Sequence, residues 1–166
     1  MTVISSTKDA EALSLVIVAE FDATTDRVWQ IWENPRQLEQ WWGPPTWPAS
    51  FPEYNFTEGG DVAYYMTGPD GSKAHGWWKF TQITPENGLE LDDGFANEDG
   101  SHVTEMGTSH MVVSIESIDD QPARSRMSIR SQFESAEQLE KMIEMGMQEG
   151  MGEAMGQIDA ILAADS

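Results

Sequence analysis

Hydrophobic and polar residues near the N-terminus follow first an extended and then a helical pattern. Residues 13–20 are rich in β-branched side chains that partly alternate with others, which predicts a strand. After Thr24 or Thr25, either of which can cap a helix, apolar residues recur at the spacing of one buried helical face. These residues are Val28, Trp29, Ile31 and Trp32. Residues 1–11 are polar and aperiodic, and we expect a loose tail there, followed by a single domain over residues 12–164.

A second short helix is predicted to end in two adjacent tryptophans. Asn34 is a typical N-cap, and Pro35 suits the first helical position. Trp41 and Trp42 close the helix, because Gly43-Pro44-Pro45 prevents it from continuing. Neighbouring residues on a helix point about 100° apart, so the two rings cannot share one narrow core stripe. We therefore expect one ring to anchor the helix end in the core and the other to lie at an edge or an opening.

Between residues 45 and 129 the pattern changes to short extended segments separated by turn residues. The strongest turn is Gly68-Pro69-Asp70-Gly71, where proline presets the backbone and glycine supplies a positive φ. Further turns are predicted at residues 58–61, 84–88 and 119–123, and a longer polar loop at residues 97–108. Between the turns at residues 58–61 and 68–71, alternation predicts that Val62, Tyr64 and Met66 face inward. Strands joined by short turns predict an antiparallel meander.

The C-terminal segment carries the pattern of one long helix. Residues 135–138 have the sequence of a capping box, and apolar residues then follow a helical period for roughly 28 residues, or about 40 Å. Gly146, Gly150, Gly152 and Gly156 should each weaken such a helix by up to about 1 kcal/mol. Either the glycines allow close approach to a sheet or an aromatic ring, or the helix is jointed. We favour close approach, because Gly146 and Gly150 share a face with methionines. The elements together predict an α+β fold with a curved antiparallel sheet around this helix.

The charge balance excludes several kinds of partner. The chain has 166 residues, which suits one domain, with 29 acidic and 9 basic side chains and a formal net charge of −20. Nucleic acid and anionic membrane surfaces would both be repelled. We expect a solvated acidic surface, although attraction of a basic protein would leave the same signature. The apolar run at residues 13–19 is too short to span a bilayer and lacks the flanks of a signal peptide, so a cytoplasmic protein is predicted.

No catalytic constellation and no metal site are predicted. The chain has no cysteine, and its three histidines, His75, His102 and His110, are not at ligand-like spacing. Neither a metal nor another cofactor is therefore expected. The acidic pairs Asp92-Asp93 and Asp119-Asp120 fall in predicted turns, where we expect solvated charges rather than catalysis. Ser131 and Tyr64 carry the hydroxyl groups whose parity points inward.

Several motifs, taken in order along the chain, resemble a known family, the bacterial homologues of the heat-shock-protein-90 ATPase activator. The N-terminal part of that family resembles Phe21-Asp22-Ala23, Val28-Trp29, Asn34-Pro35, Leu38 and Trp41-Trp42-Gly43-Pro44. Its central hairpin resembles Gly59-Gly60, residues 64–66 and residues 68–71, and its closing segment resembles residues 133–135 and 146–150. The resemblance spans residues 13–162. It implies membership of the START-like, or SRPBCC, superfamily and a helix-grip fold, in which about seven strands hold the C-terminal helix and leave a cavity.

The resemblance also suggests where a ligand would lie. Methionine and tryptophan in such numbers usually form a closed core, and the implied cavity is what makes a ligand site the expectation here. The residues that face inward by parity or by helical face are Tyr64, Met66, Trp78, Phe80, Met111, Met127, Met142, Gly146, Met147 and Gly150, with Trp41 or Trp42 at the mouth.

Three functions are compatible with this expectation. The first is binding of a small apolar or aromatic molecule in the cavity, as superfamily members do. The second is a co-chaperone-like or regulatory protein-interaction module, in line with the family's activator homologue and with the acidity. The third is an enzyme of the cyclase or hydrolase type, which would need a polar group inside the cavity. Nucleic-acid and membrane partners are not expected, and a monomer and a homodimer are both compatible with the sequence.

Overall fold

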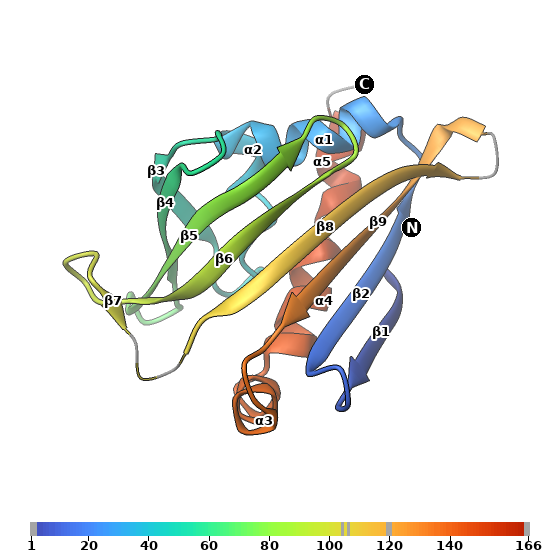
Figure 1. The fold of residues 1–166 in the computed structure, drawn as a ribbon. Coiled ribbons are helices and arrows are strands. Elements are labelled where there is room, and N and C mark those ends of the chain that lie inside the picture. The colour runs from blue at the N-terminus through green and yellow to red at the C-terminus, as the bar shows by residue number, and fades with distance from the viewer. Residues whose placement is uncertain (1–2, 104, 106, 119–120, 165–166) are drawn as a thin grey trace.

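The described residues form nine strands in one antiparallel sheet, in the order β1-β2-β9-β8-β6-β5-β4-β3, with β7 paired to β6 (Figure 1). The structure is a computed structural model and describes residues 3–103, 105, 107–118 and 121–164. The strands are β1 (Val3–Asp9), β2 (Ser14–Phe21), β3 (Ala49–Tyr54), β4 (Asp61–Thr67), β5 (Lys73–Thr84), β6 (Gly88–Ala96), β7 (His102–Val103), β8 (Ser109–Ile118) and β9 (Gln121–Gln132). The helices are α1 (Thr25–Glu33), α2 (Pro35–Leu38), α3 (Ala136–Glu144), α4 (Met147–Met155) and α5 (Ile158–Ala164).

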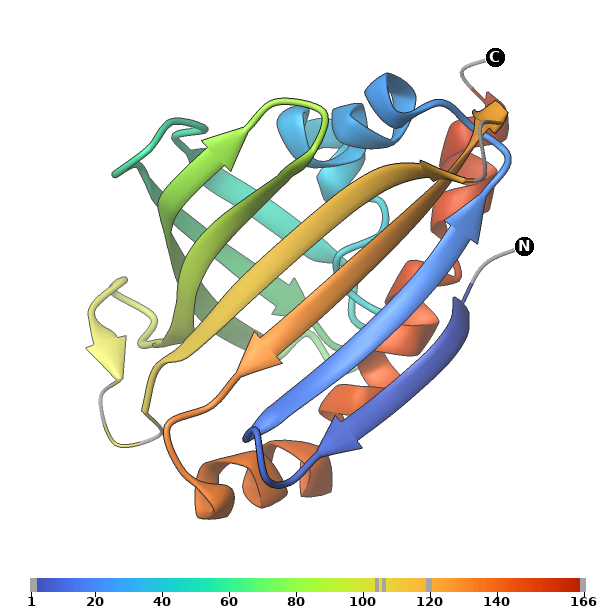
Figure 2. The same ribbon diagram turned by 45° about the vertical axis from the view of Figure 1, so that its right-hand side comes forward.

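The sheet is curved, and the helices lie on its inner side (Figures 1 and 2). α4 and α5 follow one another behind the strands, and α3 lies at the end of the sheet opposite α1 and α2. α1 packs against β8, β9 and α5, while α4 packs against β1 and β2. This is the α+β arrangement that the sequence predicts. In the part of the chain that the structure describes, no helix combines the length and apolar character needed to cross a membrane.

The two short helices form at the predicted positions. α1 buries Val28, Trp29, Ile31 and Trp32 on one face, and its N-cap is Thr24. The Asn34 side chain accepts a hydrogen bond of 2.9 Å from the Arg36 amide, which caps α2 as predicted. α2 ends at Leu38, so the expectation of a helix that extends to Trp41 and Trp42 is wrong. Both rings instead follow in a turn, where the Trp42 amide donates to the Leu38 carbonyl oxygen.

Four tryptophans brought together by these helices and the sheet make the centre of the core. The rings of Trp32, Trp41, Trp42 and Trp78 pack with centroids 4.8–6.2 Å apart. Separations in this range are typical of favourable aromatic pairs. The indole N–H of Trp41 donates to the Ile31 carbonyl oxygen at 3.1 Å, which ties the turn after α2 to α1. This cluster fixes the position from which Trp42 reaches the cavity described below.

Residues 3–9 form the edge strand β1, where the sequence pattern predicts a loose tail. β1 pairs antiparallel with β2, yet residues 5–10 are exposed. A strand whose side chains are exposed needs no hydrophobic alternation, because the backbone hydrogen bonds to its neighbour hold it in place. The polar composition therefore gave no strand signal.

The C-terminal segment is jointed, so our preference for close approach of its glycines is wrong. The Ser135 side chain accepts from the Gln138 amide as the capping box predicts, but α3 ends at Glu144. Gly146 then has φ +89°, which breaks the helix before α4 begins. A Cβ atom placed on Gly146, Gly150 or Gly152 would meet nothing within 4 Å. The glycines thus do not hold the helices close to the sheet.

The remaining differences concern the long loops. The loop at residues 97–108 contains β7, whose pairing to β6 involves two residue pairs, Phe95 with Val103 and Ala96 with His102. The predicted turn at residues 119–123 is described only from residue 121, and the pair Asp119-Asp120 lies outside the described residues.

Candidate functional site

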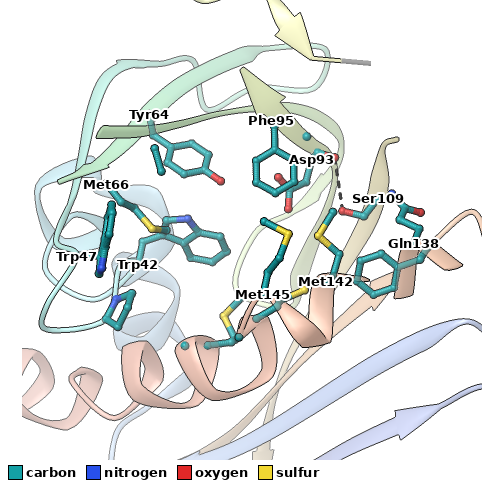
Figure 3. A pocket seen from close by; sticks show the side chains of 18 of the residues that line it. Trp42, Trp47, Tyr64, Met66, Asp93, Phe95, Ser109, Gln138, Met142 and Met145 are labelled. Atoms are coloured by element: carbon teal, nitrogen blue, oxygen red, sulfur yellow. Dashed lines mark hydrogen bonds between the residues drawn. The ribbon is translucent and has the colours of Figure 1, made fainter. Parts of the chain in front are cut away.

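A cavity of about 550 Å³ lies between the sheet and the junction of α3 and α4. Figure 3 shows side chains entering it from the sheet, from the segment that follows α2, and from the two helices. Its lining residues are Trp42, Pro44, Trp47, Tyr64, Met66, Ala74, Asp93, Gly94, Phe95, Gly107, Ser109, Phe133, Gln138, Met142, Met145, Gly146, Met147, Gly150 and Met151.

The sheet contributes alternate residues of β4 and β6. Tyr64 and Met66 face the cavity from β4, and Asp93 and Phe95 do so from β6. Side chains two residues apart on a strand share a face, so each pair enters from the same side. Tyr64 is paired across the ladder with Gly76, and a Cβ at Gly76 would lie 2.5 Å from the tyrosine hydroxyl oxygen. The absence of a side chain at this glycine therefore allows the Tyr64 ring to lie flat beside β5.

Tryptophans form the wall on the side of α2. Trp42 packs edge-on against Trp78 at 4.8 Å and against Tyr64 at 6.3 Å, so one ring belongs both to the core cluster and to the cavity wall. Its indole Nε1 is buried, and the residues that the structure describes give it no hydrogen-bond partner. Trp47 lies over Gly68, where an added Cβ would come within 2.7 Å of the ring. The turn at residues 68–71 thus accommodates a wall residue.

Methionines line the helical side. Met142 and Met145 come from the end of α3, Met147 and Met151 from α4, and Gly146 joins the two helices. Met145 is 58% exposed, so the cavity reaches the surface there. Methionine side chains are flexible and polarisable, which suits a wall that adapts to occupants of different shape. Gly146 adopts φ +89°, which interrupts the helical backbone between α3 and α4.

The polar groups of the cavity are few. Ser109 donates a hydrogen bond of 3.5 Å to the main-chain oxygen of Asp93, and the amide oxygen of Gln138 accepts from the Glu134 amide at 2.6 Å. Burial raises the pKa of the Asp93 carboxyl to about 7. Burial raises the pKa of the Tyr64 phenol above its usual value, and the nearby charge of Asp93 adds a smaller increase. The Tyr64 hydroxyl is therefore neutral at all physiological pH values.

The comparison with protein families identifies the fold. The family described as "Activator of Hsp90 ATPase homolog 1-like protein" matches residues 22–163. The chain belongs to this family. Its fold is the helix-grip fold of the SRPBCC superfamily, as the resemblance implies, and proteins of this fold commonly bind hydrophobic ligands. A comparison with curated proteins finds no match.

Solved structures of similar proteins support the same conclusion. A protein from Arthrobacter aurescens, solved by NMR in solution, is 61% identical with a TM-score of 0.92, over 98% of this chain and 93% of that one. A protein from Mycobacterium smegmatis is 39% identical with a TM-score of 0.88, over 96% of both chains. The AHSA1 protein from Silicibacter pomeroyi shares the fold, with a TM-score of 0.73 at 18% identity over 92% of this chain and 99% of that one.

The structure brings together part of the set that the sequence predicts for the ligand site. Those that line the cavity are Trp42, Tyr64, Met66, Met142, Gly146, Met147 and Gly150. Those that lie in the closed core are Trp41, Trp78, Phe80, Met111 and Met127, each at most 1% exposed. Strand parity selects the inner face of the sheet but not the part of that face that stays uncovered. Aromatic side chains from α1, from the turn after α2 and from β3 cover Trp78.

Asp93 is the acidic residue of the cavity that the sequence analysis did not predict. The other lining residues outside the predicted set are Pro44, Trp47, Ala74, Gly94, Phe95, Gly107, Ser109, Phe133, Gln138, Met145 and Met151. The pair Asp92-Asp93 is predicted to lie in a turn, but both residues belong to β6. The two carboxyls point to opposite faces, and that of Asp92 is 2.9 Å from Nδ1 of His110 on the outer face of the sheet. The signal that could have found Asp93 is its alternation with two buried leucines, Leu89 and Leu91, in the same strand.

Two further polar residues, Ser131 and Arg126, lie away from the cavity. Ser131 is 3% exposed in β9 and is not a lining residue. Arg126 lies on the outer face, where its Nη2 is 2.9 Å from the Glu20 carboxylate. Among the described residues, no group of histidine and acidic side chains is arranged to hold a metal ion.

Proposed function

We propose that this domain binds a small apolar or aromatic molecule in the cavity between the sheet and the α3–α4 junction. The observation that supports this proposal is the cavity itself, about 550 Å³ with a lining dominated by methionine and aromatic side chains. Sites for small molecules usually measure roughly 300–1,000 Å³ and combine an apolar wall with a few polar groups. Asp93, Ser109 and Tyr64 supply such groups here.

Two glycines on α4 offer a matched test of the proposal. Gly150 lines the cavity and Gly152 does not, and a Cβ at either position meets nothing within 4 Å. Gly150→Leu should occupy part of the cavity, whereas Gly152→Leu makes the same change in the same helix outside it. We expect Gly150→Leu to weaken binding of naphthylmethanol, measured by calorimetry, by about tenfold or more. The leucine side chain takes up space in which the probe would contact the apolar wall, and a tenfold loss of affinity corresponds to about 1.4 kcal/mol.

The outcomes of this test separate the cavity from the rest of the surface. Wild-type affinity in Gly152→Leu together with weakened affinity in Gly150→Leu would support the proposal. Equal affinity in both variants would contradict it, as would the absence of binding to the wild-type protein. Native mass spectrometry of freshly purified protein gives an independent check, since a co-purified ligand adds a mass that is lost on denaturation.

The protein-interaction function remains a second candidate because of the charge. The net charge of −20 favours a partner with a basic surface. The family's description as "Activator of Hsp90 ATPase homolog 1-like protein" is in line with a protein partner. Such a complex should weaken as ionic strength rises, because charge attraction is screened. Binding of a purified basic partner that is unchanged between low and high salt would argue against a charge-driven interaction.

A further inference from the structure

We propose that the cavity selects a cationic ligand that has an apolar or aromatic body and one protonated amine. The Asp93 carboxylate pairs with the ammonium group of this ligand. The inference rests on the proposed function and adds the chemical class of the ligand.

The position of Asp93 makes its carboxyl an unusual feature of the sheet. β6 is an inner strand, and Asp93 is paired with Trp78 on β5 and with Ser109 on β8. Earlier in the strand the same face carries Leu89 and Leu91, which are at most 2% exposed. The carboxyl therefore points from the middle of the sheet into the cavity (Figure 3).

The described residues offer the Asp93 carboxylate no hydrogen-bond donor and no cationic partner. Its main-chain oxygen accepts from Ser109, but the hydrogen bonds and ion pairs between described residues do not include its side chain. Asp93 is partly buried, and a carboxylate that loses part of its hydration without gaining a partner lowers the stability of the fold. A ligand that supplies a cationic donor would give this group the partner that the chain does not.

The charges around the cavity favour a cation over an anion. The described lining residues include no lysine, arginine or histidine. The ionisable side chains among them are those of Asp93 and Tyr64. The whole chain has a formal net charge of −20, which adds a negative potential over any opening. A ligand carboxylate would enter this site against repulsion, whereas an ammonium would be attracted.

Aromatic rings around the carboxyl fit the same ligand class. Phe95, Tyr64 and Trp42 line the cavity together with Asp93, and the rings lie around the space that its carboxyl faces (Figure 3). The face of an aromatic ring attracts cations, and most strongly where water is excluded. Carboxylate and ring faces together can therefore hold the charged end of an amine while the methionines contact its apolar body.

Three probes with one apolar body and different charges test the inference. Naphthylmethylamine is a cation, naphthylmethanol is neutral and naphthoate is an anion at about pH 8. We expect the amine to bind about tenfold to a hundredfold more tightly than the alcohol, as a charge-assisted hydrogen bond in a desolvated site implies, and naphthoate to bind most weakly. Calorimetric titration of the wild-type protein measures all three affinities.

Two single-charge variants on β6 assign the selectivity to one carboxyl. Asp93→Asn keeps the shape of the side chain and should remove the preference for the amine over the alcohol. Asp92→Asn removes a charge from the opposite face of the same strand and should retain the preference. Thermal unfolding of both variants shows that each is folded before it is titrated.

Each outcome bears on a different claim. Equal affinity for amine and alcohol, or a preference that survives Asp93→Asn, would overturn the inference and leave the proposed cavity intact. The absence of binding by all three probes would overturn the proposed function as well. The ranking in the wild-type protein is decisive even if Asp93→Asn does not fold.

Discussion

A carboxyl group at the position of Asp93 makes the stability of this fold depend on pH. Burial raises its pKa in the folded state to about 7, from an ordinary value of 3.8 in the unfolded chain. Between these values the folded state binds more protons than the unfolded state does, so this residue lowers the unfolding free energy as pH rises from about 4 to about 7. The penalty is fully present above the pKa of the folded state.

Replacement of Asp93 by asparagine should remove this dependence. We expect the stability of Asp93→Asn, relative to wild type, to increase by about 1–3 kcal/mol between about pH 4.5 and about pH 8, because one pKa unit corresponds to about 1.4 kcal/mol and the cavity admits some solvent. Urea unfolding at both pH values measures this change. Glu153→Gln, on the exposed side of α4, controls for loss of a negative charge alone. A relative stability of Asp93→Asn that does not change with pH would show that the carboxyl is not buried as described.

Single residues also mark the limit of prediction from the sequence. The caps at Asn34 and Ser135 are local hydrogen bonds, and their sequence signatures predict them correctly. Trp78 and Tyr64 have the same inward parity, yet Trp78 is covered by Phe51 and the other tryptophans while Tyr64 borders the cavity. This difference depends on how side chains from distant segments fill the space, and no pattern within one strand encodes it.

At the scale of elements, the joint between α3 and α4 gives the cavity its helical wall. The glycine-rich sequence is compatible with a continuous helix or a jointed one, because a helical period continues through Gly146. Only the backbone conformation distinguishes the two, and Gly146 adopts φ +89°. The edge strand β1 escapes prediction for a related reason, since its exposed side chains carry no period while its backbone pairs with β2.

Alanine substitutions at two glycines should therefore have opposite effects. Gly146→Ala should lower the unfolding free energy by about 1–2 kcal/mol, because a residue with a Cβ is strained at positive φ. Gly152→Ala should raise it by about 0.5–1 kcal/mol, because alanine is the better helix former and a Cβ there meets nothing within 4 Å. Urea unfolding compares the two variants directly. Stabilisation by both substitutions would indicate that α3 and α4 form one continuous helix.

The whole molecule combines a closed half and an open half under one sheet. The α1–α2 segment fills the inner face near Trp32 and Trp78, and the jointed α3–α4 segment leaves space near Tyr64 and Asp93. The sequence and the family resemblance predict the α+β helix-grip architecture, since the order of strands and helices determines it. They do not locate the boundary between the two halves, which depends on three-dimensional packing.

Methionines lie in both halves of the molecule and can therefore be used to compare them. Met66, Met142, Met145, Met147 and Met151 line the cavity. Met111 and Met127 lie in the closed half and are at most 1% exposed. Methyl groups of methionine give separate NMR signals that respond to a ligand nearby, so one spectrum compares the two halves within the same molecule.

The most direct test of a ligand site in the open half is a titration of methyl-labelled protein with naphthylmethylamine, followed by NMR. We expect the resonances of the cavity methionines to shift and saturate with the probe, while those of Met111 and Met127 remain in place. Shifts of Met111 and Met127 as large as those of the cavity methionines, or no saturable shift at all, would contradict a ligand site between the sheet and the α3–α4 junction.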